Sequence, residues 1–169
     1  MVEYLDIVDE SDKNIGKGTR KNIHLKNLIH RGIHVFILNK KGELLIQRRS
    51  LKKDDRPGYY DASIGAQVLS GESYEQAAIR EAKEELGLQI KKTELREICY
   101  YNSYSDRQKE NRRLFLVYND GPFGIDKSEV ASAEFWTISK IKQKIKEGKL
   151  HFTEGFLMSF QKFLESQTS

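Results

Sequence analysis

Residues 65–88, GAQVLSGESYEQAAIREAKEELGL, decide the fold of this chain, because they join a glycine-bearing loop to a well-delimited helix. Ser73 occupies the N-cap position and Gln76 follows three residues later, the spacing of a capping box. Gly87 supplies the stop signal, since glycine readily adopts the left-handed conformation that ends helices. The sequence therefore predicts a helix that begins after Ser73 and ends at Gly87.

Three carboxylates gather on one side of this predicted helix. At about 100° per residue, Glu81, Glu84 and Glu85 fall within roughly 100° of one another. Like charges at such spacings repel by roughly a few tenths of a kcal/mol per pair, and a bound divalent cation would remove that repulsion. Oxygen-only ligands are those that Mg²⁺ and Mn²⁺ prefer. A solvated acidic face is the alternative, and the loop before the helix favours the metal site.

The same segment resembles the Nudix box: glycine, five residues, glutamate, seven residues, then R-E-U-x-E-E-x-G-U, where U is aliphatic. Here Glu72 is followed by seven residues and then by residues 80–88, REAKEELGL. Ala66 stands at the opening glycine position, directly after Gly65. A match at many fixed positions is a far more specific signal than a lone glycine-rich loop. The resemblance implies an α/β fold, a Nudix-type α/β/α sandwich with a mixed β-sheet.

The resemblance also implies roles for individual residues. The metal ligands of the family match the three helix carboxylates, Glu81, Glu84 and Glu85. Glu81 takes the position that also activates water, and Arg80 resembles the arginine that orients this glutamate. Glu72 resembles the glutamate that braces the loop, and the Gly65 carbonyl takes the position of a further metal ligand. Arg80, Glu81 and Glu72 are thus the predicted catalytic set.

The chemistry implied is hydrolysis of a diphosphate linkage. Such linkages are inert because their oxygens repel an incoming nucleophile, whereas Mg²⁺ neutralises that charge and lowers the pKa of bound water. A carboxylate within reach can then take the proton. The expected reaction is Mg²⁺-dependent cleavage of a nucleoside diphosphate linked to another moiety, with Mn²⁺ as the alternative metal. The substrate itself is a small-molecule diphosphate that the sequence does not name.

Length and composition predict one cytoplasmic domain over residues 1–169. The chain is long enough for a single substantial core, and it carries a formal charge of +4. No apolar run approaches the 18 or so residues of a membrane span, and the acidic start MVEYLDIVDE lacks the features of a signal peptide. Cys99 is the single cysteine, which fits a reducing compartment.

Basic residues cluster just before the box. They are Arg48, Arg49, Lys52, Lys53 and Arg56. Cations beside an acidic metal site concentrate a polyanionic substrate, so Arg48, Arg49 and Lys52 are predicted to bind substrate. Ordinary solubilising charge is the alternative for each of them. The lysine-rich stretch at residues 140–149 is interpreted as a solvated helix face, and no nucleic-acid partner is expected.

A pass along the chain predicts strands around the box and two helices after it. An N-terminal β-hairpin is expected over residues 4–18. Further strands are expected at residues 33–38, 43–47, 59–64, 95–101, 114–118 and 133–136, and helices at residues 139–147 and 153–165. In the last two segments, apolar stripes at helical spacing are expected to face the core.

Outside the box, the first ninety residues resemble the isopentenyl-diphosphate-isomerase-like branch of Nudix proteins. The resemblance rests on the runs DIVDESDKNIG, HLKNLIHRGIHVFILNKKGELLIQRRS and PGYYDASIGAQVLSGES. The isomerases place a cysteine before the glycine position and a histidine after it, where this chain has Gly65 and Gln67. His24 and His30 lie near two further isomerase metal histidines and are interpreted as structural or substrate-proximal. His34 is expected to be a satisfied histidine inside a strand.

Three functions follow as alternatives. A metal-dependent pyrophosphohydrolase is preferred over an isopentenyl-diphosphate delta-isomerase-like enzyme and over a non-catalytic nucleotide- or RNA-binding Nudix module. A carboxylate from outside the helix often joins the metals in this family, and Glu110, Asp126 and Glu129 are the candidates. Homodimers are frequent among the proteins it resembles, so a homodimer is a further implication.

Overall fold

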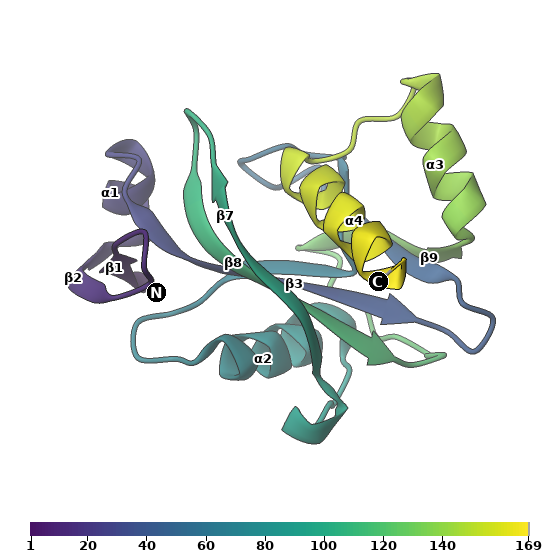
Figure 1. The fold of residues 1–169 in the computed structure, drawn as a ribbon, viewed down its shortest axis with the longest axis horizontal. Helices are drawn as coiled ribbons and strands as arrows, with labels where there is room; N and C mark the ends of the chain where they lie inside the picture. Colours follow the sequence, from purple (N-terminus) through teal and green to yellow (C-terminus); the bar gives the residue numbers. More distant parts are fainter. Residues whose placement is uncertain (169) are drawn as a thin grey trace.

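A mixed β-sheet forms the centre of the molecule in this computed structural model, which describes residues 1–168 (Figure 1). Five strands follow the order β5-β4-β3-β8-β7, while β6 pairs with β3 and β9 with β4. Their bounds are β3 Ile29–Leu38, β4 Leu44–Arg49, β5 Tyr60–Asp61, β6 Ile64–Gln67, β7 Arg96–Tyr104, β8 Lys109–Tyr118 and β9 Val130–Trp136. Because β3 and β8 run parallel and the other pairs antiparallel, the sheet is mixed as predicted.

Helices cover both faces of this sheet (Figure 1). Helix α2 (Tyr74–Leu86) packs on one face, and helices α3 (Ile138–Glu147) and α4 (Glu154–Gln167) lie on the other. A short 3-10 turn, η1 (Lys92–Glu94), precedes β7. The predicted α/β/α sandwich is therefore confirmed. No helix within residues 1–168 has the length and apolar character needed to cross a bilayer.

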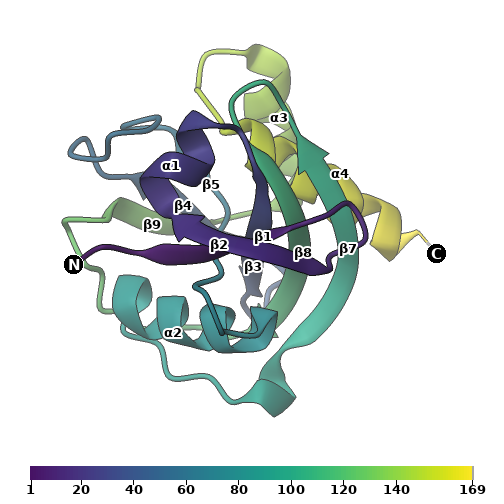
Figure 2. The same ribbon diagram turned by 90° about the vertical axis from the view of Figure 1, so that its left-hand side faces the viewer.

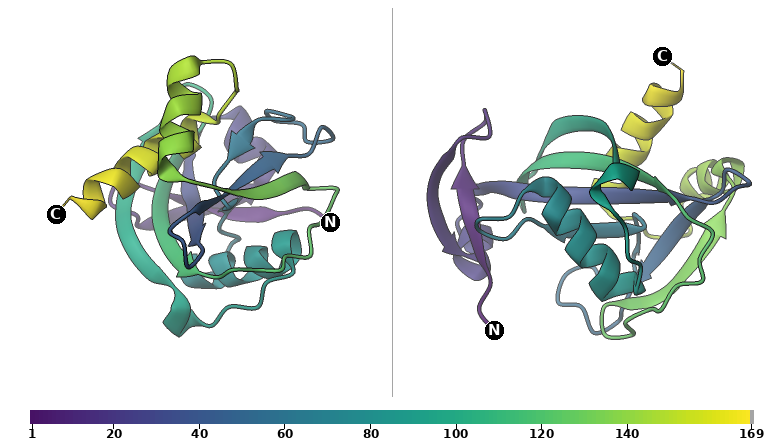
Figure 3. Two further views of the ribbon diagram at one scale, coloured as in Figure 1. Left: turned by 90° about the vertical axis from the view of Figure 1, so that its right-hand side faces the viewer. Right: turned by 90° about the horizontal axis from the view of Figure 1, so that it is seen from below.

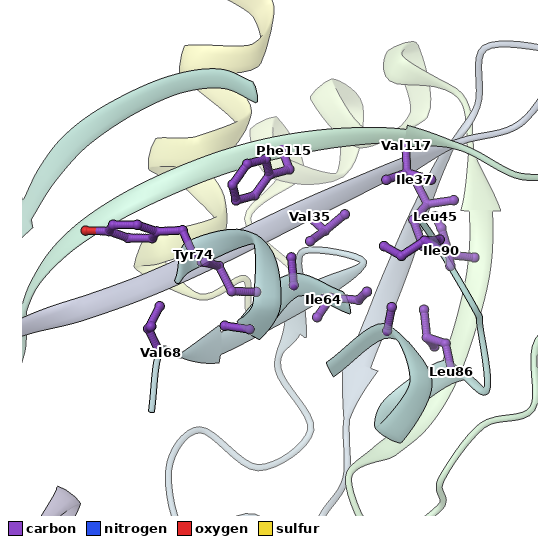
Figure 4. Packing of buried hydrophobic residues seen from close by; sticks show 14 residues of the cluster. Val35, Ile37, Leu45, Ile64, Val68, Tyr74, Leu86, Ile90, Phe115 and Val117 are labelled. Atoms are coloured by element: carbon purple, nitrogen blue, oxygen red, sulfur yellow. The ribbon is translucent and has the colours of Figure 1, made fainter. Parts of the chain in front are cut away.

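The core between the sheet and α2 is built from the central strands. Val35 and Ile37 of β3 and Phe115 and Val117 of β8 lie on the α2 side of the sheet in one cluster with Leu86, and each is at most 1% exposed (Figure 4). A second apolar cluster fills the opposite face, against α3 and α4. Burial on both faces explains why the second halves of β3 and β8 read as continuous apolar runs. The site-bearing helix is thus fixed to the most buried part of the sheet.

The N-terminal hairpin lies at one end of the molecule (Figures 2 and 3). Strands β1 (Tyr4–Val8) and β2 (Asn14–Thr19) pair antiparallel, as predicted, and lead into the short helix α1 (Arg20–Leu25). Asp6 accepts a hydrogen bond from the Ser70 hydroxyl at 2.7 Å, and Asp12 accepts one from Arg31 Nε at 2.8 Å. These contacts fasten the hairpin to β3 and to the loop that precedes α2.

Helix α2 begins and ends where the sequence predicts. The Ser73 hydroxyl accepts from the Gln76 amide at 3.1 Å, and the Gln76 side chain accepts from the Ser73 amide at 2.8 Å. Gly87 ends the helix with φ of 61°. The predicted strands at residues 33–38 and 114–118 are too short, because β3 and β8 pair in register from Ile29 and Lys109 onward. Their first halves are polar and carry no strand periodicity.

Candidate active site

One cavity of about 640 Å³ brings most of the predicted site residues together. Three groups of side chains line it. The acidic wall comprises Glu81, Glu84, Glu85 and Glu129; the basic rim comprises Arg49, Lys53 and Arg56; and the polar wall comprises His24, Gln67, Gln108, Glu110 and Arg112. Gly65 also lines the cavity. The sheet therefore places three segments around one space: the box loop (residues 65–73), the box helix α2 and the basic loop (residues 49–58).

Arg80 and Glu72 brace the loop before α2. Arg80 Nε donates to Glu72 Oε1 at 2.6 Å, and its Nη2 donates to Glu72 Oε2 at 3.0 Å. Glu72 also accepts from the Leu69 amide at 2.9 Å, while Arg80 donates to the Gln67 carbonyl at 3.3 Å. Burial alone would raise the pKa of Glu72, but these bonds lower it. The geometry fits the bracing role that the sequence predicts.

Arg80 also orients the first helix carboxylate. Its Nη1 donates to Glu81 and lies 3.4 Å from Glu84 Oε2, one turn along the helix. Burial raises the pKa of Glu81, and the contact with Arg80 offsets part of that rise. Glu84 is exposed, so α2 presents its three carboxylates at graded depths. Glu81 is thus held in the cavity by the predicted partner.

Glu85 is the deepest carboxylate of the acidic wall, at 7% exposure. Gln47 of β4 donates to its Oε2 at 2.8 Å. Burial, and then the charge of Glu81, raise the pKa of Glu85 to about 8. Its hydrogen-bond donor, Gln47, is neutral, and the positive charge of Lys53 lowers the pKa too little to offset burial. The position of Glu85 therefore favours a cation in the cavity.

Among the candidate carboxylates outside α2, Glu129 is the one whose charge acts on the carboxylates of the helix. Its charge contributes to the raised pKa of both Glu81 and Glu85, although burial is the main cause in each. Lys53 of the basic rim forms an ion pair with it. The Asp126 carboxylate accepts from Ser128, and Glu110 pairs with Arg112 in the polar wall. Of the three candidates, Glu129 shares the environment of the acidic wall.

The donor set suits a hard divalent cation. Every group of the acidic wall offers carboxylate oxygen, and Gly65 of β6 lines the same cavity. Within residues 1–168, no three carboxylate or histidine side chains already converge on one metal position. Arg80 and Lys53 instead contact Glu81 and Glu129. The residues fit Mg²⁺ or Mn²⁺ in chemistry.

The basic rim differs from the predicted substrate-binding set. Arg49 lines the cavity, where its Nη1 lies 3.3 Å from Asp61 Oδ2. Arg48 is exposed and sits over the Tyr60 ring, 5.7 Å from its centroid, and Lys52 is also exposed; neither lines the cavity. Adjacent strand residues point to opposite faces, a rule that already separates Arg48 from Arg49. Lys53 and Arg56 line the cavity instead.

In the polar wall, the sequence had singled out His24, Gln67 and Glu110, but it gave no sign of Gln108 or Arg112. His24 lines the cavity, and its Nε2 lies 3.0 Å from Gln67 Nε2. His30 is buried behind the wall, 5.0 Å from His24 between ring centroids. His34 bonds Ser159 through Nδ1 at 2.7 Å, the satisfied histidine expected, and also lines the cavity. No motif surrounds Gln108 or Arg112, and they come near the box loop only because β3 pairs with both β6 and β8.

Comparison with known proteins decides the family. The NUDIX domain family matches residues 28–156, about three quarters of the chain. The chain belongs to the Nudix family. A Nudix hydrolase of Pseudomonas aeruginosa is 35% identical over 136 residues, covering 79% of this chain and 78% of its own. The Nudix chain is thus a hydrolase that acts on diphosphate bonds, in a family that generally uses divalent metals.

Two further relatives place this Nudix chain more closely. An isopentenyl-diphosphate Delta-isomerase of Pectobacterium atrosepticum is 31% identical, covering 91% of this chain and 87% of its own. The crystal structure of DR0079 from Deinococcus radiodurans matches with a TM-score of 0.81 and 27% identity, over 94% of this chain and 98% of the other. The predicted resemblance to the isomerase-like branch is therefore confirmed, together with the Nudix fold along nearly the whole chain.

Proposed function

We propose that this Nudix hydrolase is a Mg²⁺-dependent pyrophosphohydrolase that cleaves the diphosphate linkage of a nucleoside diphosphate joined to another moiety. The observation that carries the proposal is the meeting of two charge patterns in one cavity. On α2, Glu81 and Glu84 lie beside the buried Glu85, whose pKa burial raises, and Arg49, Lys53 and Arg56 lie on the basic rim. A metal-bound diphosphate complements both.

The metal would be held by the acidic wall, with Glu81, Glu84 and Glu85 from α2, Glu129 from the loop before β9, and the Gly65 carbonyl. When bound, Mg²⁺ neutralises phosphate charge, polarises phosphorus and lowers the pKa of a bound water. Mn²⁺ has the same ligand preference and is the alternative metal. No part of this donor set requires a residue from outside the cavity.

The chain's own residues then perform the remaining tasks. Glu81 takes the proton from the attacking water, and Arg80 fixes the direction of that carboxylate through its contact. Glu72 holds Arg80 in a two-bonded ion pair, so the base is oriented through the loop brace. Arg49 and Lys53 bind phosphate oxygens, which places the linkage against the acidic wall.

The isomerase alternative lacks an acid–base pair at the box loop. Gly65 and Gln67 offer neither a thiol nor an imidazole there, and Cys99 is half-buried on β7 and does not line the cavity. A non-catalytic binding module is disfavoured for a different reason. Such a module has no use for the repulsion among Glu81, Glu84 and Glu85, which the chain retains on one helix.

Product release from a panel of diphosphates tests the proposal. The panel contains ADP-ribose, nucleotide sugars, dinucleoside polyphosphates, coenzyme A, NADH, nucleoside di- and triphosphates and isopentenyl diphosphate. Each compound is assayed with Mg²⁺, with Mn²⁺ and with chelator, and the Glu85→Gln protein serves as the blank. Metal-dependent cleavage of one class, absent from the blank, is the expected result. Isomerisation of isopentenyl diphosphate, or cleavage that persists in chelator, would overturn the proposal.

A further inference from the structure

His34 of β3 turns one ring nitrogen to the protein and the other to the cavity. Its Nδ1 atom shares a hydrogen bond with the Ser159 hydroxyl of α4 at 2.7 Å. Its Nε2 atom has no hydrogen-bond partner within residues 1–168, and Asp61 Oδ1 lies 4.0 Å away. The contact with Ser159 therefore satisfies only one of the two ring nitrogens, and the proposed hydrolysis does not yet use the other.

The free ring nitrogen is accessible from the cavity. Within residues 1–168, the buried side-chain nitrogen and oxygen atoms without a partner belong to Asn27, Arg112 and Arg113. His34 Nε2 also lacks a partner but is not one of these buried atoms, and His34 lines the cavity. A residue that is only 5% exposed thus leaves a polar atom within reach of a ligand.

The surroundings of this nitrogen join the box loop to the basic rim. Gly65 pairs with His34 in the register of β3 and β6, and a Cβ on Gly65 would lie 3.1 Å from His34 Nε2. A Cβ on Gly155 would lie 3.2 Å from His34 Cε1. Asp61, beside Nε2, is 3.3 Å from Arg49 Nη1. The Nε2 atom therefore lies between the glycine of the loop and a cation of the rim.

A chain of hydroxyl groups decides which ring nitrogen carries the proton. Arg112 Nη1 donates to the Tyr101 hydroxyl at 3.5 Å, and the Tyr101 and Ser159 hydroxyls lie 2.5 Å apart. Arginine can only donate, so the Tyr101 oxygen accepts there and donates its own proton to Ser159. Ser159 then donates to His34 Nδ1, which places the ring proton on Nε2. Any other assignment leaves a hydroxyl proton without an acceptor within residues 1–168.

Charge favours the same tautomer. An Nε2–H group is attracted by the Asp61 carboxylate, whereas a lone pair there would be repelled. Burial, followed by the charge of Arg112, lowers the pKa of His34 well below its usual value, so the ring is neutral at pH 7. Asp61 already accepts from the Thr153 hydroxyl at 2.9 Å and from the Ala62 amide at 2.8 Å. The Nε2–H group is therefore a neutral donor that remains available to a ligand.

We propose that His34 donates a hydrogen bond through Nε2–H to a phosphate oxygen of the diphosphate, and that Ser159 positions the ring for this bond. The proposal rests on the proposed function, because it needs a diphosphate between the acidic wall and the basic rim. Hydrogen bonds to charged groups are stronger than those between neutral groups. A further cation at this place would repel a divalent metal, whereas a neutral donor binds the phosphate without opposing the metal.

Nitrogen NMR of the full chain tests the tautomer and the contact without relying on a variant's stability. With ¹⁵N-labelled histidine, correlations between the ring protons and ring nitrogens distinguish a protonated nitrogen from a bare one. We expect His34 to carry its proton on Nε2 at pH 7. The Nε2 signal should shift on saturation with methylenediphosphonate in Mg²⁺, an analogue in which a methylene bridge replaces the scissile oxygen. A proton on Nδ1, or an Nε2 signal that does not move at saturation, overturns the inference.

Two substitutions separate the two ends of the ring. His34→Asn keeps an acceptor near the Nδ1 position for Ser159 and removes the cavity donor, whereas His34→Gln carries an amide donor as far as the Nε2 position. Calorimetry in Mg²⁺ should show the dissociation constant of methylenediphosphonate rising about tenfold in His34→Asn and less than about threefold in His34→Gln. His151→Asn, at an exposed residue outside the cavity, is the matched control and should bind as the wild type does.

Ser159→Ala tests the positioning role. Without the Ser159 hydroxyl, nothing in the chain of hydroxyl groups keeps the proton off Nδ1. We expect the Nδ1-protonated form to appear in the NMR spectrum, together with weaker binding of methylenediphosphonate. An unchanged tautomer in this variant would remove Ser159 from the proposal.

The outcomes separate the two proposals. Affinity that falls in His34→Asn and returns in His34→Gln supports the inference, even where no diphosphate of the panel is cleaved and the hydrolase assignment fails. Metal-dependent hydrolysis with equal binding of the analogue by wild type and His34→Asn overturns the inference and leaves the hydrolase assignment standing. Equal losses in the two variants overturn the inference as well, and so does a failure of the wild type to bind the analogue.

Discussion

Two buried glutamates line one cavity and are held in opposite states. Glu85 lies at 7% exposure beside the neutral amide of Gln47, and burial raises its pKa to about 8. Glu110 lies at 4% exposure, but Arg112, Gln108 and His30 surround it, and its pKa is far below the usual range. The same side chain at the same depth thus differs in pKa because Arg112 contacts Glu110 directly, whereas the charge of Lys53 is too weak at Glu85 to offset burial.

The two halves of the cavity therefore differ in how their buried carboxylates are compensated by positive charge. In the polar wall, the positive charge of Arg112 balances the negative charge of Glu110. In the acidic wall, Arg80 contacts Glu72 and Glu81 and Lys53 contacts Glu129, but the described residues place no ion-pair partner on Glu85. A divalent cation supplies what Glu85 lacks. Metal and diphosphate are therefore assigned to the half of the cavity that holds the acidic wall and the basic rim.

The largest effect is expected from the acidic wall. Glu84→Gln removes one charge from the exposed end of the metal ligand set, and we expect kcat to fall by roughly a thousandfold or more. The melting temperature should stay within a few degrees, since Glu84 is exposed. Glu75→Gln, on the same helix but outside the cavity, is the control and should keep normal turnover. Normal turnover in both variants would remove the metal assignment.

The next effect is a loss of stability in the polar wall. Glu110→Gln leaves the Arg112 charge buried without a counter-ion, which costs about 3 to 5 kcal/mol. The melting temperature should fall by roughly 10 °C for a chain of this size. The surface pair Arg113–Glu97, at 2.8 Å, is the comparison. Glu97→Gln should cost at most about 1 kcal/mol, because both partners are partly solvated.

The pH dependence of the same variant follows from linkage. Because the pKa of Glu110 is lower folded than unfolded, its contribution is present above the unfolded pKa and is lost as pH falls through that value toward the folded pKa. The gap in melting temperature between the wild type and Glu110→Gln should therefore narrow as the pH falls from about 5 to about 3. A constant gap down to pH 3 would contradict the assigned ion pair.

Glu85→Gln should have the opposite sign in metal-free protein. Its pKa of about 8 lies above that of the unfolded chain, so the folded state loses stability as pH rises from the usual carboxyl range to about 8. Glutamine keeps an acceptor for Gln47 and removes the charge, which should stabilise the fold by on the order of 2 kcal/mol at pH 8. Melting curves in chelator at pH 5 and pH 8 measure this. A destabilisation at pH 8 would break the contrast with Glu110.

The smallest effect concerns the basic rim. Arg49→Ala removes a cation from the cavity lining, and we expect KM to rise about tenfold with a weaker salt dependence. Arg48→Ala removes the neighbouring cation, which faces away from the cavity, and should leave KM nearly unchanged. Equal effects from the two substitutions would show that the rim acts through net charge alone.

The sequence predicted those parts of the site that lie within one short segment. The capping box at Ser73, the stop at Gly87 and the grouping of Glu81, Glu84 and Glu85 are local consequences of helix geometry, and all are present in α2. The role of Arg80 followed from family resemblance, and its contacts with Glu72 and Glu81 fit it. The roles themselves remain predictions until the variants are assayed.

Other parts depended on pairing between distant strands. The polar wall joins α1, β6 and β8 through the parallel register of β3 and β8, where His30 pairs with Glu110. Nothing near Arg112 in the sequence marks it, because its partners come from elsewhere in the fold. For the basic residues, the sequence was only partly informative. Strand alternation separates Arg48 from Arg49, but no periodic pattern predicts that the following loop brings Lys53 and Arg56 into the cavity.

Calorimetric titration of metal-free protein with Mg²⁺ tests whether the acidic wall binds the metal through Glu85. The wild type should bind Mg²⁺ and release protons at pH 7, because metal binding ionises a carboxyl group whose pKa is about 8. Titrations in buffers of different ionisation enthalpy count those protons. Glu85→Gln should bind more weakly and release fewer protons, while Glu75→Gln should match the wild type. Equal binding and equal proton release by wild type and Glu85→Gln would contradict the account.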